Sequence, residues 1–267
     1  MQVQEAIAGC WTGQIDRLTQ QLLNRLLVKG YLVQLDHPHI VCEGRHNNPY
    51  LQPQAYEALI KAVEYKEETI VISSCLRSVP QQYMLRKQYE LGICSIPAAA
   101  YPGRSQHQSG TAIDIPNNYD WKFALEKFGW QWRGAWDRYH FNFPGLLNLG
   151  ALQVQEWQRL WNEYNPNDLL KVDGDCGKKT QRTIAIAPIE GFGNDLLFQV
   201  GDINKKVGRL QILLRETLGI SPIELIADCR FGKQTTKAVM QFQQLKNLPI
   251  TGICDRKTLK ALGYQYA

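Results

Sequence analysis

Two histidines and two aspartates in the first half of this 267-residue chain have a spacing that suits metal-dependent chemistry. His107 and Asp114 lie in the stretch SQHQSGTAID (105–114), and Asp137 precedes His140 by three residues. Zinc binds imidazole nitrogen and carboxylate oxygen, and a catalytic zinc keeps three protein ligands and one open position. We therefore expect His107, Asp114 and His140 to bind one metal ion. Asp137 would serve as general base toward a metal-bound water, which suits amide hydrolysis.

Two short alternating segments are expected to position these groups. TAIDI (111–115) puts its isoleucines on one face and Asp114 on the other, as in a half-buried strand. YHFNF (139–143) puts its aromatic residues on an apolar side and His140 on the opposite side. Gly110 indicates that the segment containing His107 is a loop leading into the first strand.

The remaining pattern of the first half predicts an α+β domain. Apolar residues recur with a helical period over 15–27, and further helices are expected over 54–64 and 81–92. The β-branched run TIVIS (69–73) predicts another strand. Helices that alternate with a few antiparallel strands are typical of a small α+β fold.

The second half contains an internal repeat. DGDCGKKT (173–180) and DCRFGKQT (228–235) share Asp, Gly and Thr at the same offsets, and TGICDRKTLKAL (251–262) is a shorter third copy. Each copy lies between helical segments, which predicts an all-α helical repeat module. We therefore expect a catalytic domain at 1–148 and a helical module at 149–267. The repeats of that module are expected near 151–193 and 200–263.

Composition and charge exclude several classes of protein. The formal net charge is +5 and 44% of the residues are hydrophobic, which is typical of a globular chain with a core. No apolar run is long enough to span a bilayer, and no dense Lys/Arg stripe indicates nucleic-acid binding. The seven cysteines include no CxxC pair, which argues against a zinc ribbon and leaves the redox compartment and the disulfide pairing open.

The motif at 105–114, with the acidic residue three before the second histidine, resembles the VanY-like D-alanyl-D-alanine carboxypeptidases of the lysostaphin, D,D-peptidase and hedgehog superfamily. That resemblance implies Zn²⁺ bound by His107, Asp114 and His140, with Asp137 as the catalytic base. Many carboxypeptidases of the family have Glu at this position. Asp is similar to the L-alanyl-D-glutamate endopeptidases of phage lysins.

Two further segments extend the resemblance. SSCLRSVPQQ (73–82) is similar to the family segment SxYRSxxxQ, which implies that Arg77 binds a substrate carboxylate or the developing oxyanion, with Gln82 as a polar neighbour. Ser105, the first residue of the zinc motif, is a further candidate for substrate binding. The C-terminal repeat resembles the peptidoglycan-binding modules that accompany many wall hydrolases.

These observations predict a zinc-dependent peptidase that hydrolyses an amide bond in the stem peptide of bacterial cell-wall peptidoglycan. The alternatives are a lysin-type endopeptidase, a peptidase of free peptides, and a wall-binding protein without catalytic activity. The segment Met1–Gly13 lacks a basic start and an apolar run of signal-peptide length. We therefore expect either that any export signal has been removed or that the protein leaves the cell by another route. We expect the protein in the cell envelope or outside the cell.

Overall fold

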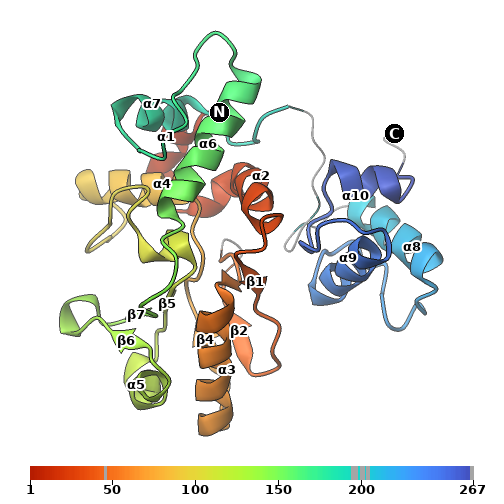
Figure 1. The fold of residues 1–267 in the computed structure, drawn as a ribbon, viewed down its shortest axis with the longest axis horizontal. Helices are drawn as coiled ribbons and strands as arrows, with labels where there is room; N and C mark the ends of the chain where they lie inside the picture. Colours follow the sequence, from red (N-terminus) through yellow and green to blue (C-terminus); the bar gives the residue numbers. More distant parts are fainter. Residues whose placement is uncertain (45–46, 194–197, 199–201, 203–204, 265–267) are drawn as a thin grey trace. The chain divides into compact units, whose positions relative to one another are not determined.

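The structure, a computed structural model, describes residues 1–44, 47–193, 198, 202 and 205–264. The chain divides into two units, Met1–Phe192 and Gly193–Ala267, each with its own hydrophobic core (Figure 1). Among the described residues, no helix combines the length and the apolar character that crossing a bilayer requires.

The N-terminal unit combines helices with small β-sheets, as the predicted α+β class requires. Short 3₁₀ helices at Ile7–Gly9, Thr12–Ile15, Gln106–Ser109 and Ala135–Asp137 connect these elements. The helices are α1 (Val3–Ala6), α2 (Asp16–Leu27), α3 (Pro53–Lys66), α4 (Val79–Glu90), α5 (Asn118–Lys127), α6 (Gly150–Tyr164) and α7 (Lys178–Ile186). The strands are β1 (Val33–Gln34), β2 (Ile40–Cys42), β3 (Tyr50–Leu51), β4 (Ile70–Ile72), β5 (Ala112–Asp114), β6 (Gln131–Trp132) and β7 (His140–Asn142).

The strands predicted from alternation form a three-stranded antiparallel sheet in the order β5-β7-β6. As expected, Ile113 and Phe141 are fully buried, and they pair across the two strands. Tyr139 differs from the expectation, because its side chain is 40% exposed and lies just before β7 rather than in the core. β2 and β4 form a parallel pair, and a bridge between Ser74 and Asp114 joins the segment after β4 to β5.

The start of α4 is fixed by a capping box at Ser78. The Ser78 hydroxyl accepts a hydrogen bond from the backbone N–H of Gln81, and the Gln81 side chain accepts one from the Ser78 N–H. Val79 and Pro80 follow in the first turn, where proline's missing N–H costs nothing. Because Arg77 directly precedes this cap, the capping box also restricts the backbone that carries Arg77.

The division between the two units falls later in the chain than the expected boundary at residue 148. Helices α6 and α7 were expected in the C-terminal module, but they pack into the N-terminal unit. Trp157 and Ile184 share a core with Leu18, Leu22 and Met84. The reason is that α6 buries its apolar face against α2 and α4.

The C-terminal unit contains α8 (Lys205–Leu218), α9 (Lys233–Leu245) and α10 (Arg256–Ala261), in agreement with the predicted helical module. Its core is built around Leu210, Phe231, Phe242 and Leu259, all of them nearly or fully buried. The module is thus a small helical domain with a core of its own.

A buried glutamine at the centre of each repeat shows that the three sequence copies share one local structure. Gln158, Gln211 and Gln243 each use their amide nitrogen to donate to a backbone carbonyl and to a threonine hydroxyl of the following motif. Each amide oxygen accepts a backbone N–H of the same turn. The first copy keeps this structure although it belongs to the N-terminal unit.

Replacing Gln243 by leucine is expected to destabilise the C-terminal unit by about 3 kcal/mol. The change leaves the buried N–H groups of Thr251 and Gly252 without their acceptor, and an unsatisfied buried group costs about 1–3 kcal/mol. Differential scanning calorimetry of the full chain would measure the transition of this unit. Gln241→Leu, on the exposed side of α9, is the control and should change stability by no more than about 0.5 kcal/mol. Equal effects of the two changes would contradict the prediction.

Candidate active site

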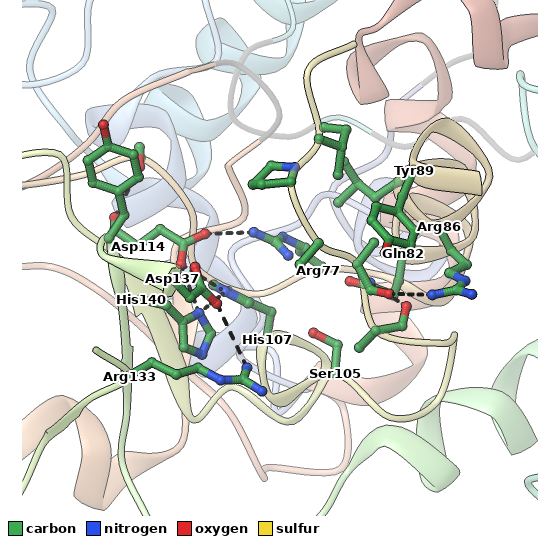
Figure 2. Close-up of a pocket in the computed structure, with 18 of the residues that line it drawn as sticks. Arg77, Gln82, Arg86, Tyr89, Ser105, His107, Asp114, Arg133, Asp137 and His140 are labelled. Atoms are coloured by element: carbon green, nitrogen blue, oxygen red, sulfur yellow. Dashed lines mark hydrogen bonds and ion pairs between the residues drawn. The ribbon is translucent and has the colours of Figure 1, made fainter. Parts of the chain in front are cut away.

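The three predicted ligand residues come together from three segments of the N-terminal unit. Asp114 ends β5, and His140 begins β7 directly opposite it in the antiparallel register. His107 lies on the 3₁₀ helix Gln106–Ser109 that precedes β5. Figure 2 shows their side chains converging beside a cavity of about 440 Å³. Strand pairing therefore brings together groups that are far apart in the chain.

Gly110 explains how the chain turns from the first histidine into β5. Its φ of 65° lies in the left-handed region that favours glycine. A Cβ at this position would come within 2.6 Å of Leu32 Cδ2 and 3.3 Å of the Gln52 backbone nitrogen. The glycine of the motif is thus required both for the turn and for the close approach.

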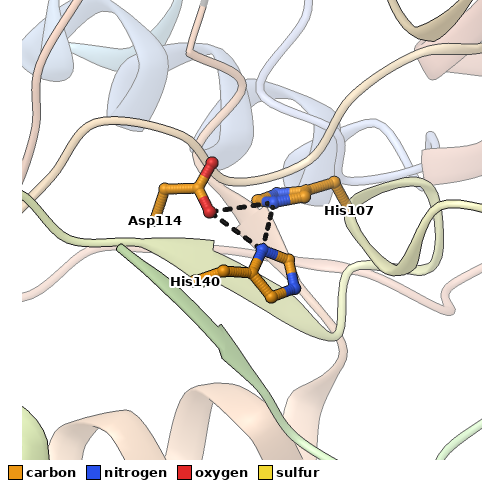
Figure 3. A group of neighbouring side chains, drawn as sticks. All are labelled: His107, Asp114 and His140. Carbon is orange, nitrogen blue, oxygen red and sulfur yellow. Dashed lines mark hydrogen bonds and ion pairs between the residues drawn. The ribbon is translucent and has the colours of Figure 1, made fainter. Parts of the chain in front are cut away.

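The three side chains lie within hydrogen-bonding range of one another (Figure 3). His140 Nδ1 lies 2.9 Å from Asp114 Oδ1, and His107 Nε2 lies 3.2 Å from the same oxygen. The two ring nitrogens are 3.1 Å apart. The prediction that these three residues meet is therefore supported by the geometry, and together they could hold a metal ion.

The outer hydrogen bonds of the two histidines determine where their protons are. His107 Nδ1 lies 2.7 Å from the carbonyl oxygen of Cys75, which accepts only, so this nitrogen carries the proton. His140 Nε2 lies 2.6 Å from the amide oxygen of Asn142 and donates to it for the same reason. The facing atoms, His107 Nε2 and His140 Nδ1, then present lone pairs, as does Asp114.

Three electron-pair donors that face each other without a proton between them fit a cation. Two imidazole nitrogens and one carboxylate oxygen are a donor set that zinc accepts at a catalytic site. The carbonyl and amide oxygens behind the histidines match the outer partners that usually orient metal-bound imidazoles. The residues present therefore fit Zn²⁺.

Burial and nearby charges hold these groups in the protonation states that metal binding needs. Burial and the Arg77 guanidinium lower the pKa of His107 from 6.5 to about 4, which keeps the ring neutral near pH 7. Burial alone would raise the pKa of Asp114, but nearby positive charge, that of the Arg77 guanidinium included, holds it well below its usual value. Both groups are thus ready to coordinate a cation without first releasing a proton.

The metal-free protein is expected to lose roughly 3 kcal/mol of stability as the pH falls from 6.5 to 4, because unfolded His107 binds a proton near pH 6.5 and folded His107 only near pH 4. The contribution is therefore fully present above pH 6.5 and is lost below it. Urea unfolding in chelator at several pH values would measure it. His107→Gln should flatten this pH dependence. Identical pH dependence in both proteins would show that His107 is not its source.

Arg77 lies beside the cluster and contacts one of its members directly. Its Nη2 donates to Asp114 Oδ2 at 2.7 Å, and its Nε donates to the Ser74 hydroxyl at 3.0 Å. The side chain is 23% exposed and lines the cavity. Arg77 therefore fixes the carboxylate of Asp114, and its unused donors remain at the cavity surface.

Gln153 is a supporting residue that the sequence analysis missed. Its amide oxygen accepts the N–H of Val79, and its amide nitrogen donates to the carbonyls of Arg77 and Gln108. It thus joins α6 to the two segments that carry Arg77 and His107. The helical period placed Gln153 on α6, but its partners lie 45 and more positions earlier in the chain.

Asp137 lies at the end of the 3₁₀ helix Ala135–Asp137 and lines the same cavity as the cluster. Its carboxylate is half-buried, and Oδ2 lies 3.9 Å from Nη1 of Arg133. Figure 2 shows it beside His140. The position is compatible with the predicted role of general base, because a base must reach the reacting groups from the cavity wall.

Gln82 and Ser105 also line the cavity, on the side away from β7. The amide nitrogen of buried Gln82 donates to the carbonyl of Ala100 at 2.9 Å, while its amide oxygen has no partner within the described part of the chain. Ser105 is the N-cap of the 3₁₀ helix and belongs to a capping box there. Ser105 thus has a structural role, and its role in substrate binding stays a prediction.

A disulfide between Cys10 and Cys94 holds one wall of this cavity. The wall is the segment Ile96–Ala100, which begins two residues after Cys94. Side-chain bonds from Gln82 to Ala100 and from Arg86 to Ala99 also hold it. Cysteine spacing alone does not determine this pairing, which depends on the fold.

Removing this disulfide with the double change Cys10→Ser and Cys94→Ser is expected to lower the unfolding free energy by about 2–4 kcal/mol, because the crosslink restricts the unfolded chain across 84 residues. Chemical unfolding with and without reductant would measure it. The double variant also serves as the control for reductant. Reductant should lower the unfolding free energy of the native protein and leave that of the variant unchanged. A native protein that is insensitive to reductant would contradict the prediction.

Family models match a segment in each of the two units. Residues 49–142 match the D-alanyl-D-alanine carboxypeptidase family. The match includes Arg77, all three candidate ligands and Asp137. Residues 204–262 match a putative peptidoglycan binding domain, which corresponds to the C-terminal unit. A comparison with curated proteins found no match. The two family matches together support a peptidase that acts on peptidoglycan.

Proposed function

We propose that the protein is a zinc-dependent peptidoglycan peptidase that hydrolyses an amide bond in the stem peptide, in the manner of a D-alanyl-D-alanine carboxypeptidase. The observation that carries the proposal is the convergence of three possible ligand atoms, from His107, Asp114 and His140, beside a cavity within the family-matched segment. When bound, Zn²⁺ would polarise the scissile carbonyl and make water a better nucleophile at neutral pH.

Asp137 is proposed to move the proton in this reaction. As a carboxylate on the cavity wall it accepts a proton from the attacking water and then gives it to the leaving amine. One group can serve both steps because the accepting and donating forms differ only by that proton. The role needs Asp137 to be ionised when substrate binds.

Arg77 is proposed to act at the opposite side of the reacting carbonyl. Its contact with Asp114 fixes the carboxylate, and its remaining N–H groups face the cavity, where negative charge develops on the carbonyl oxygen. A guanidinium suits this position because it stays charged and its donors have a fixed geometry. Gln153 and the capping box at Ser78 keep the backbone of Arg77 in place.

The C-terminal unit is proposed to keep the enzyme at its substrate. Tethering raises the local concentration of stem peptides even if the intrinsic affinity of the module is low. The disulfide Cys10–Cys94 fits a protein that works in an oxidising compartment, in agreement with a place in the cell envelope or outside the cell.

The deciding experiment is mass spectrometry of the soluble products released from purified peptidoglycan by the zinc-loaded protein, beside a chelator-treated sample. Free D-alanine that appears only with zinc would support the carboxypeptidase. A new D-glutamate amino terminus would instead support an endopeptidase, the alternative that Asp at position 137 favours. No product in either sample, with the protein still sedimenting with the wall, would leave a wall-binding protein without catalytic activity.

A further inference from the structure

Arg133 places a third guanidinium at the cavity, in a position that the family motifs do not include. It follows β6, and its backbone N–H donates to the carbonyl of His140 at 3.0 Å. Its side chain lines the cavity, with the guanidinium carbon 4.7 Å from the ring centre of Trp136. The contact places the guanidinium over an aromatic face, which restricts its position before any ligand binds.

The three guanidinium groups of the cavity differ in how far their donors are used. Arg77 donates to Asp114 and Ser74. Arg86 donates to the carbonyl of Ala99 and to the carboxylate of Glu90. Arg133 makes no side-chain hydrogen bond to any residue that the structure describes, and its side chain is 42% exposed.

The one ionic neighbour of Arg133 among the described residues leaves its donors available. Nη1 lies 3.9 Å from Asp137 Oδ2, which is beyond hydrogen-bonding distance. A guanidinium in this state can bind a carboxylate through two parallel hydrogen bonds, the strongest arrangement available to it. Among the described residues, Arg133 is therefore the arginine of this cavity whose side-chain N–H groups are all available to bind an anionic group of the substrate.

The position of Asp137 indicates which substrate group reaches Arg133. In the proposed reaction Asp137 gives a proton to the leaving amine, so the leaving residue passes next to Asp137. A substituent on the α-carbon of that residue then lies toward Arg133, because the two side chains are neighbours (Figure 2). Among the substituents of that carbon, the α-carboxylate is the one whose negative charge a guanidinium binds.

The geometry points to Arg133 as the binding group for this α-carboxylate, so that the enzyme selects amides whose leaving amine carries a free α-carboxylate; the inference rests on the proposed function. At both candidate scissile bonds the leaving residue has a free α-carboxylate. A terminal D-alanine has this group, and so does a D-glutamate that is linked onward through its side-chain carboxyl. Arg77 remains available for the carbonyl oxygen.

The test compares peptides that differ only in this group, with the leaving α-carboxylate either free or converted to the carboxamide, in one pair for D-alanine and one for D-glutamate. Arg133→Gln is expected to raise KM for the free carboxylate about 10- to 100-fold, with a small effect on kcat. KM for the carboxamide should stay unchanged. Whichever pair the wild type cleaves identifies the source of the carboxylate.

Arg138→Gln is the matched control, because Arg138 lies in the same connection, is exposed, and does not line the cavity. It removes the same charge and should leave both KM values unchanged. An equal rise in KM for the carboxylate and carboxamide peptides would overturn the inference. A shifted pH profile without a change in KM would also overturn it and would indicate that Arg133 acts through Asp137 and does not bind the substrate. An unchanged Arg133→Gln enzyme would also overturn it.

A calorimetric titration separates this inference from the proposed function. If the zinc-loaded wild type cleaves neither peptide pair, the proposed function fails, and binding of the same peptides is then measured directly. Tighter binding of the free carboxylate by wild type, lost in Arg133→Gln, would support the binding site without the reaction. Equal binding of carboxylate and carboxamide by wild type would overturn it.

Discussion

His107→Ala is expected to abolish stoichiometric zinc binding and to reduce turnover of peptidoglycan fragments by at least about 10⁴-fold, equivalent to about 5.5 kcal/mol of transition-state stabilisation. The change removes one of three donor atoms that lie within 4.8 Å of one another. Asp114 and His140 would remain, and two ligands hold zinc much more weakly than three. Metal analysis after dialysis and a peptide-release assay would measure both effects.

His39→Ala is the control for this result. His39 is exposed and bonds to Thr69, away from the cavity. The variant should keep one zinc and full turnover. A circular dichroism spectrum equal to that of wild type would show that His107→Ala is folded, and His140→Gln provides a second variant if it is not. Full activity in a folded, zinc-free His107→Ala protein would refute the proposed metal site.

Asp137→Asn is expected to lower kcat by about 10² to 10⁴-fold while zinc stays bound, because the carboxamide cannot accept the proton of the attacking water. The three candidate ligands are untouched, so metal content should equal that of wild type. KM should change little, since Asp137 is proposed to act on the proton rather than to bind the peptide. Steady-state kinetics beside metal analysis would separate this effect from loss of zinc.

Two further variants sharpen the result for Asp137. Asp137→Glu keeps the carboxylate and should retain part of the activity, whereas Asp120→Asn changes an exposed aspartate on α5 and should have no effect. A kcat for Asp137→Asn within about threefold of wild type would show that another group moves the proton. The prediction concerns kcat, so a change confined to KM would also count against it.

The short-range features of the site could be predicted from sequence. Side chains alternate between the two faces of a strand. The face on which Asp114 and His140 lie therefore follows from their sequence neighbours alone. The helical period of α2 follows from local apolar spacing in the same way, and helices were also expected at 54–64 and 81–92, where α3 and α4 lie. Family resemblance then connected the distant histidines, and the structure brought them together as expected.

Other features depend on which surfaces pack together, and local patterns carry no information on that. The repeat motif at 173–180 correctly indicated a helix-turn-helix unit. The same motif recurs at 228–235, between α8 and the first turn of α9, so it could not show that α6 and α7 belong to the N-terminal unit. The assignment depends on the burial of Trp157 against α2 and α4, two helices that lie more than 60 residues earlier in the chain.

The local sequence thus indicated which chemical groups the site contains. The fold determined their protonation and which of their hydrogen-bond donors are already in use. Residue types and spacing, with the family resemblance, were sufficient to propose the ligand set and the base and to find the internal repeat. Tertiary contacts place the Cys75 carbonyl and Asn142 where they accept the histidine protons on the side away from the proposed metal site, and they pair Arg77 with Asp114. They also left Arg133 with its donors available. Protonation and donor occupancy depend on atoms within about 3 Å, and those neighbours come from distant segments of the chain.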